Sequence, residues 1–147
     1  MLGVAAVAVV GAASAGIALA AGTSAAEGLS GRYTTKVAST AFRGGLTGTW
    51  RLTLRGRMYT FTFTGMTAKN VIISGRYSIA RGRITFKQMS AACSSMKASG
   101  CMPVMSCRGV GVYHLRRIGR TLSFVRVRDP HCLYRPIVLS ERFRRTR

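Results

Sequence analysis

The sequence predicts an all-β protein: one small up-and-down antiparallel β-barrel of about eight strands. Two observations carry this prediction. Apolar and polar residues alternate through almost every segment after residue 28, as in strands that bury one face. Short turns that contain glycine separate these segments, so consecutive strands are expected to pair as hairpins. Since an open sheet of eight strands would leave two exposed edges, we expect the sheet to close into a barrel.

The chain of 147 residues has room for one domain, and a distinct segment precedes it. The first 22 residues are uncharged and consist of small and apolar residues, which is typical of a secretory signal peptide. The run is nearly long enough to span a bilayer, so a retained membrane anchor is the alternative. We therefore expect a signal or anchor in residues 1–26 and a barrel domain in residues 27–147, secreted or associated with the cell envelope.

Eight segments of alternating polarity are the candidate strands. They cover residues 33–37, 49–54, 58–64, 71–79, 83–87, 110–116, 121–127 and 136–141. Residues 88–109 form the one long gap between them and are expected to be a loop, because they are rich in Cys, Ser and Met. No segment has a helical period of useful length.

Three dipeptides are expected to form two-residue turns: Arg55-Gly56, Arg81-Gly82 and Ile118-Gly119. These turns place apolar residues on one shared face, and a slip by one residue would reverse the faces. The predicted pairs across the turns are Trp50 with Phe61, Leu52 with Tyr59, Ile79 with Ile84, Tyr77 with Phe86, Leu115 with Leu122, and Tyr113 with Phe124. Continued alternation would place Arg126 inside, which either a bulge near Phe124 or a strand end would correct.

The inward residues have two interpretations. They either line a pocket for an apolar ligand or fill a barrel of short strands, and the number of rings slightly favours filling. The candidate lining residues are Trp50, Leu52, Tyr59, Phe61, Tyr77, Phe86, Tyr113, Leu115 and Phe124; Leu54, Phe63, Ile79, Ile84 and Leu122 complete the inward set.

The four cysteines are an even number in a small exported domain, which is typical of disulfides. The sequence contains no C-x-x-C pair, and neither histidine lies at ligand spacing from a pair of cysteines, so no metal site is expected. No cofactor is expected either. Extending the third hairpin brings Cys107 close to Cys132, which favours the pairings Cys107–Cys132 and Cys93–Cys101. The alternative pairings are Cys93–Cys132 and Cys101–Cys107.

The charge is strongly unbalanced, with 23 Lys and Arg against 3 Asp and Glu, a formal net charge of +20. Such a surface attracts polyanions, although an arginine-biased composition would produce it without selection for binding. An exported protein meets wall polymers and lipid headgroups rather than cellular DNA, so nucleic acid is not an expected partner. The candidate contacts with an anionic surface are Arg51, Arg76, Arg83, Lys87 and Arg116.

Enzymatic activity is not expected, because catalysis by paired acids needs carboxylates that meet. The acids are Glu27, Asp129 and Glu141, and no pattern brings the last two together. His131 shares a turn with Asp129, where a salt bridge from Asp129 to Arg135 is the better interpretation than a catalytic triad. The sequence favours a protein that binds.

The segment Gly48-Thr49-Trp50 at a strand start, followed by Gly75-Arg76-Tyr77, resembles the calycin superfamily of lipocalins and avidins. The stretch 48–143 is similar to secreted bacterial lipocalin-like domains. The matching positions are Gly48 and Trp50, Gly75 and Tyr77, Phe86, Gly111 and Tyr113, and Asp129 to Arg135, where Asp and Cys stand one residue further apart than in the family.

The resemblance implies a binding module for a small apolar or amphiphilic ligand, with Arg142 or Arg144 stacked on Trp50. A single tryptophan makes this chain a poor candidate for binding biotin, and the second lipocalin signature is absent. The alternative function is a structural or adhesion protein of the envelope, whose basic exterior binds an anionic wall polymer, a membrane surface or a protein partner.

Overall fold

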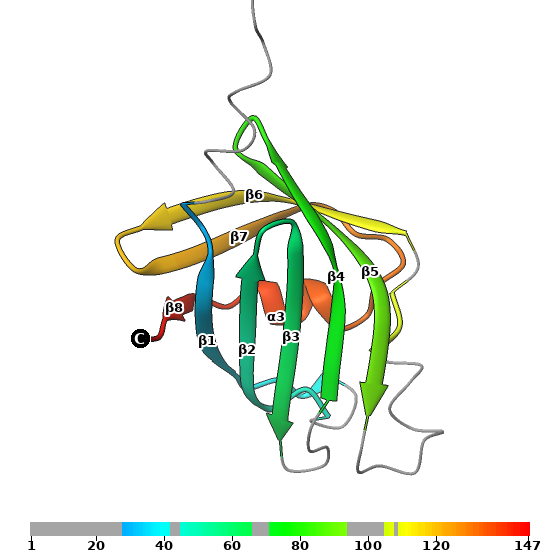
Figure 1. The fold of residues 1–147 in the computed structure, drawn as a ribbon. Coiled ribbons are helices and arrows are strands. Elements are labelled where there is room, and N and C mark those ends of the chain that lie inside the picture. The colour runs from blue at the N-terminus through cyan, green and yellow to red at the C-terminus, as the bar shows by residue number, and fades with distance from the viewer. Residues whose placement is uncertain (1–27, 42–44, 66–70, 94–104, 108) are drawn as a thin grey trace, which may run out of the picture.

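The computed structural model describes residues 28–41, 45–65, 71–93, 105–107 and 109–147, and they form a closed antiparallel barrel of eight strands (Figure 1). Each strand pairs with its neighbours in sequence, and the last pairs with the first, as the alternation predicts. The strands are β1 (Gly31–Val37), β2 (Gly48–Arg55), β3 (Met58–Gly65), β4 (Val71–Ala80), β5 (Arg83–Cys93), β6 (Val110–Ile118), β7 (Thr121–Arg128) and β8 (Phe143–Arg145).

The segment after β7 differs from its prediction. The sequence predicts a strand over residues 136–141, but the short helix α3 (Arg135–Leu139) occupies this place and β8 follows it. Pro136 lies in the first turn of α3, where a helix tolerates proline because no backbone donor is needed there. A run of five residues is too short for its period to distinguish a helix from a strand. The strand β8 then closes the barrel by pairing with both β1 and β7.

The turn at Arg81-Gly82 is confirmed. Both residues have positive φ, 50° for Arg81 and 70° for Gly82, as a tight two-residue hairpin turn requires. The predicted pairs Ile79 with Ile84 and Tyr77 with Phe86 are present. Strand β5 continues to Cys93, six residues beyond its predicted end and into the segment expected to be a loop.

The other two hairpin registers are wrong by two residues. The turns are Gly56-Arg57 and Gly119-Arg120, because glycine takes the first central position of each turn and not the second. Either central position accepts a positive φ, so the dipeptide alone does not determine the register. The observed pairs are Trp50 with Phe63, Leu52 with Phe61, Leu54 with Tyr59, Leu115 with Phe124, and Tyr113 with Arg126. A shift of two residues leaves every side chain on its predicted face.

The inward set is confirmed: its members are buried, except that Ile79 and Leu115 are half-buried. A bulge near Phe124 was one expectation. The register shift instead lies where Val112 pairs with Arg128 and the next residue, Tyr113, pairs with Arg126. Arg126 is exposed, as the alternative expectation required.

Figure 1 shows β6 and β7 running at a steep angle to β2 and β3, with α3 behind β2 and β3 and below β7 in this view. Within the described ranges, no helix has both the length and the apolar composition needed to cross a membrane. Residues 1–26, in which the signal or anchor is expected, lie outside those ranges.

Candidate functional site

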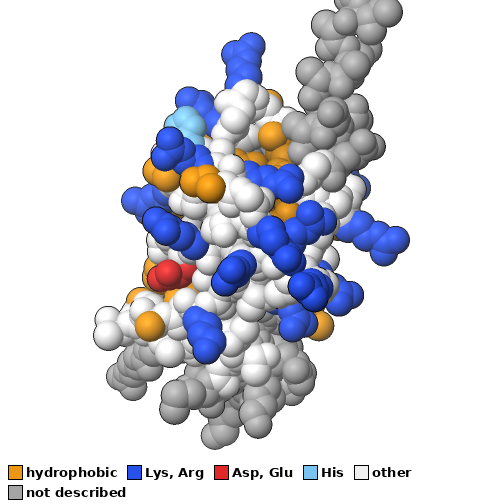
Figure 2. Space-filling view, turned by 90° about the vertical axis from the view of Figure 1, so that its left-hand side faces the viewer, with side chains coloured by type: hydrophobic (Ala, Val, Ile, Leu, Met, Phe, Trp, Pro, Cys, Tyr) orange, Lys and Arg blue, Asp and Glu red, His pale blue; other side chains and the backbone are white. Residues whose placement is uncertain are grey.

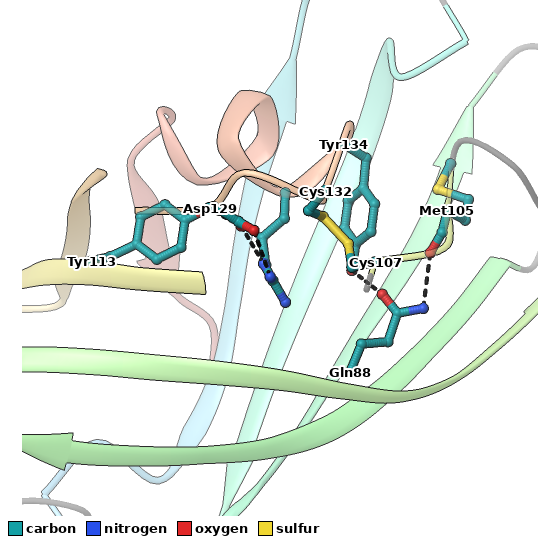
Figure 3. Close-up of a disulfide and its surroundings, with 8 residues drawn as sticks. Gln88, Met105, Cys107, Tyr113, Asp129, Cys132 and Tyr134 are labelled. Carbon is teal, nitrogen blue, oxygen red and sulfur yellow. Dashed lines mark hydrogen bonds and ion pairs between the residues drawn. A yellow bond between two sulfur atoms is a disulfide. The ribbon is translucent and has the colours of Figure 1, made fainter. Parts of the chain in front are cut away.

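A buried polar cluster lies where β6, the end of β7 and α3 meet (Figure 3). Arg135 donates two hydrogen bonds to Asp129, from Nε to Oδ2 at 2.6 Å and from Nη2 to Oδ1 at 2.8 Å. The hydroxyl of Tyr113 donates a third hydrogen bond to Oδ2 at 2.6 Å. Both charged side chains are 0% exposed. This bidentate geometry is the strong form of an ion pair, and it confirms the salt bridge expected between these two residues.

Gly111 on β6 makes room for this ion pair. A Cβ at position 111 would lie 2.5 Å from Oδ2 of Asp129 and 2.8 Å from Nε of Arg135. Neither atom can retreat without breaking the pair, so only glycine fits at this position. The glycine that the resemblance matched to a family motif therefore has a packing role here.

Two more polar groups are buried beside the cluster without a hydrogen-bond partner in the described part of the chain: Nη1 of Arg135 and the hydroxyl of Tyr59. Burial raises the pKa of Tyr59 to about 12, although the nearby positive charge of Arg135 lowers it. Burial, together with the hydrogen bond to Asp129, also raises the pKa of Tyr113. Both phenols therefore stay protonated at neutral pH, and the cluster carries one positive and one negative charge.

The rim beside the cluster is cross-linked by the Cys107–Cys132 disulfide, which confirms the favoured pairing. The hydroxyl of Tyr134 donates to Oε1 of Gln88 at 3.3 Å, and Nε2 of Gln88 donates to the carbonyl of Met105 at 2.9 Å. Cys101 and the side chain of Cys93 lie outside the described residues, so their pairing stays a prediction. A disulfide in a small domain is typical of an oxidising compartment.

Trp50 is covered by aromatic rings, so the arginine stacking implied by the resemblance is wrong. Phe63 and Tyr134 stack on the indole with centroid distances of 4.6 and 5.7 Å, and its Nε1 donates to the carbonyl of Leu46. Arg142 and Arg144 are exposed instead. The reason is that α3 carries Tyr134 into the barrel before the chain reaches β8.

The structure brings the candidate lining residues together as one packed cluster. The ring of Phe61 lies at its centre, with neighbouring rings at centroid distances of 5.6 to 6.3 Å. Sequence reasoning missed the part of this cluster that follows β7, although Pro136 could have indicated a helix start. The missed residues are Tyr134, Val138, Leu139 and Phe143, all of which are 0% exposed.

The predicted surface cations all lie on the outer wall, four of them on the neighbouring strands β4, β5 and β6 and Arg51 apart from these. Arg76 pairs with Lys87 across β4 and β5, and Arg83 pairs with His114 across β5 and β6. Arg116 follows two residues after His114 on β6, whereas Arg51 lies on β2 between neutral threonines. Figure 2 shows Lys and Arg side chains over much of one face, with acidic atoms at a single place.

Among the described residues, no group of three or more His, Cys, Asp or Glu side chains could hold a metal ion. Comparisons with protein-family models, with curated proteins and with solved structures found no match. The closed antiparallel barrel is compatible with a lipocalin-like fold.

Proposed function

We propose that this protein is an extracytoplasmic, non-enzymatic barrel of lipocalin-like fold that binds anionic polymers of the cell envelope through its outer wall. One observation carries the proposal. In the described ranges, Arg135 is the one Lys or Arg side chain that is buried, and the one acid outside the barrel is Glu141. The exterior cations therefore have almost no internal counter-charge, and external anions relieve their mutual repulsion.

The close packing of the interior also favours binding at the outer wall over an enclosed ligand. A barrel that carries a ligand needs open volume among its inward side chains. Here Trp50, Phe61 and Tyr134 are in mutual ring contact, and α3 places further side chains between the strands. Asp129, the acid nearest to these rings, is held by Arg135 and Tyr113, which leaves it unsuited to act as a catalytic base.

Retention on a purified anionic wall preparation tests the proposal. The protein is expected to be retained at low ionic strength and released at high salt, because exposed charges are screened as the Debye length shortens. The matched control is the same wall preparation stripped of its anionic polymer, on which retention should disappear. Equal retention on both materials, or retention that survives high salt, would contradict the proposal.

A second candidate function, enclosure of a small ligand, is favoured by the unpartnered Nη1 of Arg135 and hydroxyl of Tyr59. A ligand with an oxygen acceptor would satisfy both groups. Native mass spectrometry of the purified protein tests it: a discrete added mass that is lost on denaturation supports an enclosed ligand. A spectrum that contains the protein mass alone would rule it out for the purified material.

A further inference from the structure

The outer wall carries four hollows that join end to end. The first, of about 560 Å³, and the second, of about 570 Å³, share Thr85 as a lining residue. The second and third share His114, and the third and fourth share Arg116. Neighbouring hollows thus meet at a shared lining residue, and we call this row of hollows the outer groove, defined by Arg57, Arg76, Lys87, Arg81, Arg83, His114, Arg116 and Arg142.

The outer groove follows strand β6. Each of its four hollows is lined by at least one residue of β6, beginning at Val110 and ending at Ile118. Outward positions on a strand recur every second residue, at intervals of roughly 6.7 Å, and a strand of nine residues measures roughly 30 Å. The groove therefore extends along most of β6 and suits an extended chain rather than a compact molecule.

Cationic side chains flank the groove along its whole length, and no described acid lines it. Strands β4 and β5 supply one side, Arg116 stands on β6, and Arg142 closes the far end. Arg128 is exposed and pairs with Val112, which lines the second hollow. Successive outward positions of β6, roughly 6.7 Å apart, thus each have a cation on a paired strand, with Lys87 opposite Val110, Arg128 opposite Val112 and Arg83 opposite His114.

The surroundings also indicate what kind of polyanion fits. Every Trp, Tyr and Phe in the described part of the chain is buried, so nucleic-acid bases would have no exposed ring on which to stack. The uncharged residues of the groove are mostly aliphatic or hydroxylated, such as Met58, Val112 and Thr85. Tyr77 also lines the first hollow, but its side chain is only 3% exposed.

We infer that the outer groove is a binding site for a linear, base-free polyphosphodiester that lies along β6. This inference rests on the proposed function, because it gives the anionic polymer a chemical class and a path. Arginine and lysine suit this ligand, since both donate charge-assisted hydrogen bonds to phosphate oxygens.

The direct test measures the affinity of the full folded protein for an abasic deoxyribose-phosphate oligomer long enough to span the groove. If four to seven groove cations each neutralise one phosphate, the logarithm of the binding constant falls with the logarithm of salt concentration with a slope of about −3 to −5. Binding that does not respond to salt would overturn the inference.

Two double variants with the same loss of charge locate the site. Arg83→Gln with Arg116→Gln removes cations from the groove, whereas Arg32→Gln with Arg51→Gln removes them from β1 and β2. Strand β2 lies four strands from β6 in either direction around the closed barrel, so the second variant is a matched control. The groove variant is expected to lose affinity about tenfold at low salt and to flatten the slope by about 1.4, and the control to change much less.

The outcomes separate this inference from the proposed function. If both double variants weaken binding equally, binding is diffuse and the groove is not the site, while adhesion to anionic polymer still stands. If the unmodified protein binds neither the oligomer nor the wall preparation, the proposed function fails as well. Tighter binding of a base-bearing oligonucleotide, or displacement of the oligomer by anionic lipid vesicles at a lower phosphate concentration, would overturn the choice of ligand.

Discussion

Arginine occurs in two opposite settings in this protein, and the contrast separates stability from binding. Arg135 is fully buried, and Asp129 neutralises it through two hydrogen bonds. The arginines of the outer groove are exposed to solvent and have no acidic partner among the described residues. A charge in the interior needs its partner within the fold, because desolvation is costly, whereas a charge on the wall can take its partner from outside. The same residue type therefore supports the fold in one place and is available to a ligand in the other.

The largest expected effect comes from unpairing the buried charge. Asp129→Asn removes the negative charge and leaves the guanidinium of Arg135 buried without compensation. We expect the free energy of unfolding to fall by about 3–5 kcal/mol, measured by denaturant titration. The triple variant Tyr113→Phe, Asp129→Leu and Arg135→Met removes the whole polar cluster and should regain most of this loss. A loss below about 1 kcal/mol in Asp129→Asn would show that Arg135 finds another partner.

Removing the rim cross-link should cost slightly less. The Cys107–Cys132 disulfide spans 25 residues of sequence, and the chain-entropy model gives about 3.5 kcal/mol for closing such a loop. The double variant Cys107→Ala with Cys132→Ala is therefore expected to have a free energy of unfolding lower by about 3.5 kcal/mol, measured by denaturant titration. Its affinity for anionic polymer should be unchanged while it is folded, because neither cysteine lines the outer groove.

The burial of Tyr59 should lower the free energy of unfolding at high pH. Its folded-state pKa of about 12 exceeds the ordinary value of 10, so the unfolded chain loses this proton first as the pH rises. Stability is therefore fully present below pH 10 and falls between pH 10 and 12, by about 2–3 kcal/mol from this residue. Tyr59→Phe should lack that part of the decline in denaturant titrations at pH 9, 10.5 and 11.5. An identical pH dependence in both proteins would contradict the assignment.

The smallest effect on stability is expected from substitutions of exposed arginines on the outer wall. Arg83→Gln and Arg51→Gln should each change the free energy of unfolding by less than about 0.5 kcal/mol, since both side chains are exposed. Any change should be stabilising at low salt, because removing a cation reduces repulsion within the basic exterior. Thermal melting at low and high salt measures this difference. A large loss of stability in either variant would mean that the wall arginines support the fold, and the contrast with Arg135 would disappear.

Local pattern was enough to predict most of the barrel. Alternation placed Trp50, Phe61 and Phe86 inward and Arg51, Arg76 and Arg83 outward, and all six lie on those faces. The period of two depends only on the geometry of a single strand, so it can be read without knowing the partner strand. Two registers were nevertheless wrong, because a glycine in a dipeptide turn can take either central position.

The site was harder to predict than the barrel. The pairing of Asp129 with Arg135 was expected from their proximity in sequence, but not its burial or the contribution of Tyr113 from β6. These features depend on α3 turning into the barrel, and five residues carry too weak a period to predict that turn.

By itself, the sequence determined the class of fold, the inward and outward faces, the favoured cross-link of the rim and the strong positive charge. Each of these depends on local alternation, on residue counts or on spacing along one hairpin. Only the tertiary structure decided that Tyr134 and not an arginine covers Trp50, that one arginine is buried, and that cations of β5 and β7 lie opposite residues of β6. Those outcomes depend on which distant segments meet when the barrel closes. The residues of a single segment do not specify which other segments become its neighbours in the barrel.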